Sequence, residues 1–253
     1  MNIRSLILSA LFVVCFSIST MAKDLTVAVA ANVQYTFEEI RTAFEQETGI
    51  PVTGVIGSSG KFTAQIENGA PFDVFLSADM EYPKALAKER LTHNDPRVYA
   101  YGTLVLWTMD DRDLFGGVAA ALTDPSVRKI AIASPATAPY GRAAVNALKH
   151  LGVYNQIQGK LIYGESIAQT NQFITTKAAN LGFTARSIVM ADNMKDKGRW
   201  IEVDKGTYDP IAQGAVILKN AEKQHLEQAQ KFFDFLFSDE AAAIFKKYGY
   251  ILP

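Results

Sequence analysis

Four short segments rich in small and polar residues stand where a predicted strand ends and a predicted helix begins. They are Ala30–Asn32, Gly57–Gly60, Ser134–Tyr140 and Glu165–Ile167. The first turn of a helix carries N–H groups without intrahelical partners and the positive end of the helix dipole. Ser hydroxyls and the Asn amide add neutral donors, and glycine lets a ligand approach the backbone. One such turn is usually only a helix cap, but four together favour a site for a small polar or anionic ligand.

The residue types needed for catalysis are scarce. Histidine occurs only at His93, His150 and His225, each among polar residues in or just after a predicted helix, so we interpret all three as surface residues. No His/Cys/Asp cluster has metal-ligand spacing. The chain also has no GxxxxGK phosphate loop and no GxSxG nucleophile elbow. We therefore expect a binding protein that is not an enzyme and needs no cofactor.

The elements that hold these turns alternate between strands and helices. Short apolar runs predict strands at residues 25–30, 52–56, 72–76, 129–133, 161–163 and 181–184. Helical spacing predicts helices at residues 33–48, 62–68, 79–90, 140–151, 166–177, 222–237 and 241–248. The order strand, helix, strand occurs in two separate blocks, which predicts two α/β units with mostly parallel sheets flanked by helices.

Three apolar segments connect the two blocks. Residues 97–109 are too long and too apolar for a surface loop, so they are predicted to cross from the first unit to the second. Residues 200–203 and 213–218 are predicted to return. The sequence therefore predicts a first lobe made of residues 23–100 and 209–253, a second lobe of residues 101–208, and a ligand cleft between them.

The N-terminus and the charge balance restrict where the protein acts and on what. Residues 1–22 combine a basic start, an apolar run and small residues before a polar segment, which predicts a signal peptide cleaved after Ala22. Cys15 lies inside it, so the mature chain is expected to lack cysteine. A net charge of -1 argues against nucleic acid or an anionic membrane as the main partner. An anion would have to be held by local dipoles.

Several stretches resemble the periplasmic molybdate-binding proteins of ABC-type uptake systems. They are Thr26–Asn32 (TVAVAAN), Gly57–Gly60 (GSSG), Gly69–Asp79 (GAPFDVFLSAD) and Ala242–Pro253 (AAIFKKYGYILP). The resemblance covers essentially the whole mature chain. It implies a two-lobed type II periplasmic binding protein fold that closes on molybdate or tungstate. It also implies a periplasmic monomer that delivers the anion to a membrane-embedded ABC permease through a transient contact.

The same resemblance assigns the oxyanion to donors at the four turns. Asn32 stands where many relatives have Ser, and Ser59 contributes from the second turn. Tyr140 stands where other relatives offer the backbone N–H of a small residue, and Ile167 contributes its own backbone N–H. Secondary candidates are Ala31 and Ser58. Molybdenum or tungsten is expected only as the oxyanion, held by these same residues.

One position departs from the family pattern. Some relatives bind the anion with a Tyr hydroxyl in a segment that matches residues 181–186, where this chain has Ala185. We hypothesise that Tyr140 supplies the phenol from the other side. Changing Tyr140 to phenylalanine is then expected to weaken binding by roughly 1–3 kcal/mol, the cost of leaving a charged acceptor short of a donor.

Two alternatives remain open at this stage. The first is a binding protein of the same fold for sulfate, phosphate or a small organic anion. An organic acid usually requires an arginine for bidentate capture, and the candidates are Arg142 and Arg186. The second is an exported enzyme on this scaffold, which the sequence disfavours because it offers no nucleophile–base pair.

Overall fold

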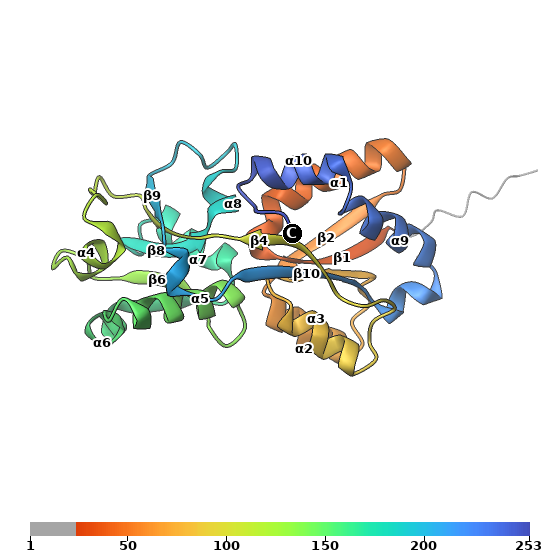
Figure 1. Cartoon of the computed structure of the whole chain (residues 1–253), viewed down its shortest axis with the longest axis horizontal. Coiled ribbons are helices and arrows are strands. Elements are labelled where there is room, and N and C mark those ends of the chain that lie inside the picture. The colour runs from red at the N-terminus through yellow and green to blue at the C-terminus, as the bar shows by residue number, and fades with distance from the viewer. Residues whose placement is uncertain (1–23) are drawn as a thin grey trace, which may run out of the picture.

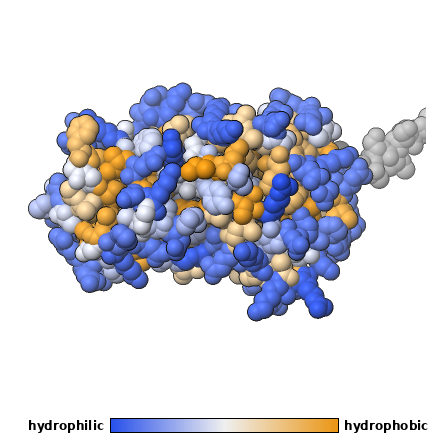
Figure 2. Space-filling view, in the orientation of Figure 1, coloured by the Kyte–Doolittle hydropathy of each residue, from blue (hydrophilic) through white to orange (hydrophobic). Residues whose placement is uncertain are grey.

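The computed structural model describes residues 24–253 and contains two five-stranded sheets, one in each lobe (Figure 1). The predicted signal peptide and Cys15 lie outside the described residues. Within residues 24–253, no helix is long and apolar enough to cross a membrane. Figure 2 shows that hydrophilic residues cover most of the outline of one face, while hydrophobic residues show along its middle.

The first sheet has the strand order β2-β1-β3-β10-β4. Its strands are β1 (Leu25–Ala30), β2 (Val52–Gly57), β3 (Val74–Leu76), β4 (Arg97–Gly102) and β10 (Ile211–Ile217). β1 pairs in parallel with β2 and with β3, whereas β10 runs antiparallel to both β3 and β4. The carboxyl ends of β1 and β2 therefore lie at one edge of the sheet, where the first two polar turns follow them.

The second sheet repeats this plan with the order β7-β6-β8-β5-β9. Its strands are β5 (Leu104–Thr108), β6 (Ile130–Ala133), β7 (Leu161–Gly164), β8 (Leu181–Ala185) and β9 (Arg199–Glu202). β6 pairs in parallel with β7 and β8, and β5 runs antiparallel to β8 and β9. The expected two-lobed α/β fold is confirmed. Each sheet is mixed, because the strands that link the lobes are antiparallel to their neighbours.

Alternating side chains of β1 separate two hydrophobic cores in the first lobe. Val27 and Val29 pack with α1, α9 and α10, while Ala28 packs with α2 and α3 on the opposite face. These helices are α1 (Gln34–Thr48), α2 (Ser59–Glu67), α3 (Glu81–Lys88), α9 (Leu226–Phe235) and α10 (Asp239–Lys247). A strand buried on both faces reads as a continuous apolar run, which is the pattern seen at residues 25–30.

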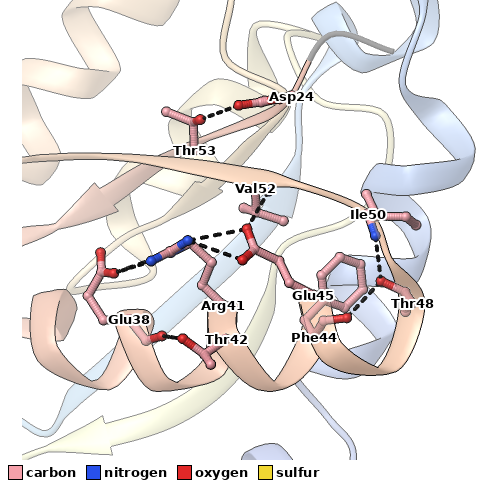
Figure 3. Close-up of polar contacts among 10 residues, drawn as sticks. All are labelled: Asp24, Glu38, Arg41, Thr42, Phe44, Glu45, Thr48, Ile50, Val52 and Thr53. Atoms are coloured by element: carbon pink, nitrogen blue, oxygen red, sulfur yellow. Dashed lines mark hydrogen bonds and ion pairs between the residues drawn. The ribbon is translucent and has the colours of Figure 1, made fainter. Parts of the chain in front are cut away.

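Helix α1 is fastened to β2 by the polar contacts drawn in Figure 3. The Arg41 guanidinium donates to Glu38 and Glu45, and Glu45 also accepts a hydrogen bond from the Val52 backbone N–H at 2.8 Å. Gly49 ends the helix in the left-handed region at φ 69°, as the sequence predicts for a helix stop. The helix is thereby held so that its N-terminal end stays at the edge of the sheet that carries the polar turns.

The helices of the second lobe are partly those expected. They are α4 (Gly117–Thr123), α5 (Pro139–His150), α6 (Tyr154–Ile157), α7 (Ile167–Thr175) and α8 (Arg186–Val189). The sequence predicts α5 and α7 within two residues at each end. It gives no signal for α4, α6 or α8, because the two shortest have only one turn each and α4 is a brief Ala-rich stretch.

The chain crosses between the lobes twice, from β4 to β5 and from β9 to β10. Figure 1 shows β4 and β10 in the middle of the molecule. The segment at residues 97–109, predicted as one crossing strand, is two strands in different sheets, separated by Thr103. β9 and β10 form the return path. The backbone N–H of Arg186 donates to the Thr103 carbonyl at 2.9 Å, which ties the start of α8 to the crossing point.

Candidate functional site

A cavity lies between the lobes, at the carboxyl ends of the parallel strands. It measures about 200 Å³, open solvent at its mouth included. Its lining contains all six residues predicted from the sequence, namely Ala31, Asn32, Ser58, Ser59, Tyr140 and Ile167. The remaining lining residues are small or apolar: Ala30, Gly57, Ala78, Ala138 and Pro139. No lining residue carries a formal charge, so a ligand here would meet only neutral groups.

Ser58 and Ser59 bring two hydroxyls to the cavity at the start of α2. The Ser58 hydroxyl is buried and has no hydrogen-bond partner among residues 24–253. The Ser59 hydroxyl oxygen accepts a hydrogen bond from the Ala78 backbone N–H at 3.0 Å, which leaves its own proton free to be donated. A buried, unpartnered hydroxyl is costly in an isolated protein, so the pair indicates a ligand with acceptor atoms.

Three helices begin at the cavity. Ser59, Tyr140 and Ile167 occupy the first or second position of α2, α5 and α7 respectively. Their backbone N–H groups make no hydrogen bond within the described part of the chain. They are the amides that an α-helix leaves unpaired at its N-terminus, and α5 and α7 belong to the opposite lobe from α2. Donors from both lobes therefore converge on one cavity.

The Tyr140 phenol points away from the free donors of the cavity. Its oxygen accepts a hydrogen bond from Gln213 Nε2 at 3.3 Å and lies close to Gly102, and neither of these residues lines the cavity. Burial raises the pKa of the Tyr140 phenol well above its usual value of 10, so the group stays protonated. The geometry favours the Tyr140 backbone N–H as the donor to a ligand, while a direct role for the phenol remains a prediction.

Asn32 lies at the end of β1, in a 3-10 turn formed by Ala31–Val33. Its side-chain nitrogen donates to Gln213 Oε1 at 2.8 Å and to the Tyr250 hydroxyl at 3.3 Å. Both amide hydrogens are thus used behind the cavity. The donor that Asn32 can offer to a ligand is its backbone N–H, a distinction that the sequence alone does not reveal.

Ala185, where some relatives are expected to have Tyr, is buried and does not line the cavity. It caps the start of α8 in an extended conformation and pairs with Leu104 across the second sheet. The side of the cavity next to α8 therefore has no hydroxyl from this position.

Charged residues surround the mouth of the cavity and pair across the lobes. The Arg142 guanidinium of α5 forms an ion pair with Asp79 and lies 3.2 Å from a carboxylate oxygen of Glu81. On the same side, Lys61 pairs with Glu165 of the second lobe. These contacts, missed by the sequence analysis, hold the lobes together at the rim.

The two arginines considered for an organic acid both have partners. Arg142 is engaged at the rim, and Arg186 forms an ion pair with Glu202 at 2.9 Å. Neither lines the cavity. The structure thus offers no free guanidinium for bidentate carboxylate capture at this site.

A backbone contact also crosses the cleft. The Gly60 N–H donates to the Thr137 carbonyl at 2.9 Å, and the Tyr82 hydroxyl donates to the Ala136 carbonyl at 3.3 Å. Helix α2 in the first lobe therefore touches the loop before α5 in the second lobe. This contact is possible because Gly60 has no side chain.

One histidine is not where the sequence analysis places it. His225 is buried, and its Nδ1 lies 3.0 Å from Asp73 Oδ2. The surface interpretation is wrong for this residue because His225, the residue just before α9, packs its side chain against Asp73. Asp73 also accepts hydrogen bonds from Asn220 and from the Thr26 backbone N–H. Within residues 24–253, no group of three or more His, Cys, Asp or Glu residues is placed to hold a metal ion.

Comparisons with known proteins identify the family of the chain. The molybdate-binding protein ModA of Azotobacter vinelandii is 40% identical over 92% of this chain and 91% of its own length. The molybdate-binding protein ModA of Rhodobacter capsulatus is 40% identical over 91% of this chain and 89% of its own. The solved structure of the Azotobacter vinelandii periplasmic molybdate-binding protein superimposes with a TM-score of 0.84 at 36% identity, covering 91% of this chain and all of that one. Residues 25–251 match the bacterial extracellular solute-binding protein family, and the chain belongs to that family.

Proposed function

We propose that this protein captures molybdate or tungstate in the periplasm and delivers it to an ABC permease for import. The observation that carries the proposal is the convergence of unpaired helix N-terminal amides from both lobes on one cavity without charged residues. The two molybdate-binding relatives, each 40% identical over most of the chain, support the choice of ligand. We propose both anions as ligands because they have the same charge and nearly the same shape.

Neutral donors suffice to hold a dianion. Each N–H or O–H that points at an anionic oxygen forms a charge-assisted hydrogen bond, and helix dipoles add to the attraction. Closure of the lobes removes water and strengthens each of these contacts. Backbone amides only donate, so the O–H of an anion such as monohydrogen phosphate would bury an unmatched donor wherever it faced one of them.

The remaining parts of the function rest on relatives and on the sequence. The predicted signal peptide and the periplasmic relative support a periplasmic location. Membership of a solute-binding family supports a transient permease partner and a role without catalysis. We further propose that the protein works as a monomer, since the two lobes must move relative to each other.

Isothermal titration of the mature protein tests the function directly. We expect one-to-one binding of molybdate and of tungstate, with no competition from sulfate or phosphate. Binding of sulfate or phosphate in place of molybdate would keep the fold and refute the ligand. Failure to bind any oxyanion would refute the function.

A pair of variants at Ile167 tests whether its backbone N–H donates a hydrogen bond to the bound anion. Ile167 is the first residue of α7, where proline is tolerated in a helix, and the preceding Ser166 is extended, as a residue before proline prefers. Ile167→Pro removes the N–H together with part of a buried side chain and is expected to weaken molybdate binding by about 1.5–3 kcal/mol. Ile167→Val, the matched control, keeps the N–H and should bind as the unchanged protein does. Equal affinities for the two variants would show that this amide is not a ligand.

A further inference from the structure

The buried carboxamide of Gln213 lies behind the cavity and contacts both lobes. Gln213 is completely buried on β10, at the position where the pairing with β4 shifts register between Gln213 and Gly214. β10 belongs to the first sheet and follows the return path from the second lobe. Gln213 is the one polar residue of β10, and its side chain is buried in the interior of the protein.

The hydrogen bonds of Gln213 fix the orientation of its carboxamide. Oε1 accepts from Asn32 Nδ2 at 2.8 Å and lies 2.8 Å from the Tyr99 hydroxyl, both in the first lobe. Nε2 must then face the other way, and it donates to the Tyr140 hydroxyl of the second lobe at 3.3 Å. The carboxamide is thus a bridge with its acceptor in one lobe and its donor directed to the other.

Both residues at the ends of this bridge also line the cavity. Asn32 follows β1 and Tyr140 is the second residue of α5, and neither backbone N–H has a hydrogen-bond partner within residues 24–253. Asn32 is held further by the Tyr250 hydroxyl, which donates to its carbonyl at 3.1 Å, and by the Ser187 hydroxyl of the second lobe at 2.7 Å. A shift of Asn32 or Tyr140 would therefore move a candidate ligand donor.

We propose that Gln213 is a positioning residue that couples the oxyanion donors of the two lobes, through its simultaneous hydrogen bonds to Asn32 and Tyr140. It does not touch the ligand. It sets the relative position of the two backbone donors once the lobes have closed, and opening the cleft breaks its bond to Tyr140. This inference rests on the proposed oxyanion-binding function and adds a residue outside the cavity to it.

A double-mutant cycle tests the coupling. Gln213→Met keeps the side-chain length and removes the hydrogen bonds to Asn32, Tyr99 and Tyr140, and Tyr140→Phe removes only the hydroxyl group. Each single change is expected to weaken molybdate binding by about 2-fold to about 10-fold, the usual net effect of one neutral hydrogen bond. The double variant should bind molybdate no more weakly than the weaker-binding single variant, because both changes break the same hydrogen bond between Gln213 and Tyr140. Tyr99→Phe removes a contact to the same carboxamide within the first lobe, so it should have the smallest effect.

A second pair of variants keeps the test valid if Gln213→Met does not fold. A methyl group at Gly102 would lie 2.0 Å from the Tyr140 hydroxyl oxygen and 2.6 Å from Gln213 Nε2. Gly102→Ala therefore pushes these two groups apart and should weaken binding. Adding Tyr140→Phe removes the oxygen in the tightest contact, so it should recover part of the affinity that Gly102→Ala loses.

Lobe closure provides a readout that does not depend on the affinity. Residues 24–253 contain no cysteine, so cysteines introduced at the exposed positions Lys88 and Gln156, one in each lobe, can carry spin labels cleanly. In pulsed dipolar spectra, Gln213→Met should increase the population with a long interlobe distance, both without ligand and at saturating molybdate.

The outcomes separate this inference from the proposed function. If the unchanged protein binds no molybdate, the function is wrong, and the ligand-free distance distributions still decide whether Gln213 favours the closed arrangement. If it binds molybdate, but the effects of Gln213→Met and Tyr140→Phe multiply, or Gln213→Met changes neither affinity nor closure, the coupling is refuted and the function stands.

Discussion

Gly60 offers the sharpest test of the closed arrangement of the lobes. It is the second residue of α2, beside the cavity but not part of its lining. A methyl group there would lie 2.9 Å from the Thr137 Cα and 3.0 Å from the Thr137 carbonyl oxygen, across the cleft, and 2.6 Å from the Tyr82 hydroxyl. The first two contacts involve backbone atoms, which cannot swing aside as a flexible side chain can. Gly60→Ala therefore obstructs closure without disturbing the interior of either lobe.

The expected magnitude follows from the two interactions that the methyl group affects. Overpacking by one carbon typically costs about 1–3 kcal/mol, and this range includes the weakening of the hydrogen bond from the Gly60 N–H to Thr137. The Kd for molybdate should rise about 5-fold to about 150-fold. The thermal stability of the ligand-free protein should be unchanged or slightly higher, because alanine is a better helix residue than glycine.

Calorimetric titration and thermal melting measure these two opposite effects on the same samples. Gly159→Ala is the matched control, because a methyl group there meets nothing within 4 Å. That variant should bind and melt as the unchanged protein does. Wild-type affinity in Gly60→Ala would refute the reasoning, since it would mean that the contact between α2 and the loop before α5 is not part of the ligand-bound state.

Three further predictions concern Ser59, the buried phenols and the buried contact between Asp73 and His225. Ser59→Ala removes a free hydroxyl donor and should weaken molybdate binding by about 1–3 kcal/mol in a calorimetric titration, whereas wild-type affinity would remove Ser59 from the ligand set. The Kd should be constant from about pH 6 to about pH 9, because burial raises the pKa of Tyr140 well above 10 and that of Tyr250 to about 12, so both phenols keep their protons; a titration step in this range would point to an ionisable group in contact with the ligand. His225→Ala leaves the buried Asp73 short of a hydrogen-bond partner and should lower the free energy of unfolding by about 1–3 kcal/mol in urea denaturation, with an unchanged Kd for the folded protein; an unchanged unfolding midpoint would contradict a structural role for the pair.

The sequence predicts the fold well where the hydrophobic pattern is produced by burial alone. β1 is buried on both faces, and the expected range of residues 25–30 agrees with the structure. The crossing segment at residues 97–109 is less well predicted, because an apolar run does not show that the chain changes sheets at Thr103. Helix α2 begins at Ser59, three residues before the expected start at Phe62, since Ser59, Gly60 and Lys61 carry no apolar periodicity.

The candidate site shows the same division between local and long-range information. The four turns are visible in the sequence because cap residues and glycines mark strand-to-helix junctions, and the structure brings residues of all four to one cavity. The contacts behind and around the cavity are not visible, because they join residues far apart in the chain. Asn32 and Gln213, for example, are separated by 181 positions, and nothing in the neighbouring sequence marks Gln213 as a hydrogen-bond partner of Asn32.

The net charge of -1 and the neutral cavity together explain how a dianion could be held without a charged partner. An arginine or lysine in the cavity would attract any anion and would need its own counter-charge in the empty state. The structure instead places its charges at the rim, where Arg142 and Lys61 are paired with carboxylates of the opposite lobe. Each lobe alone offers only part of the donor set and leaves it in water, where N–H and O–H groups bind anions weakly. Affinity must therefore arise at closure, when the two partial sets meet around a ligand that is losing its water. It follows that a residue at the contact between the lobes, such as Gly60, should influence affinity as strongly as residues that touch the anion.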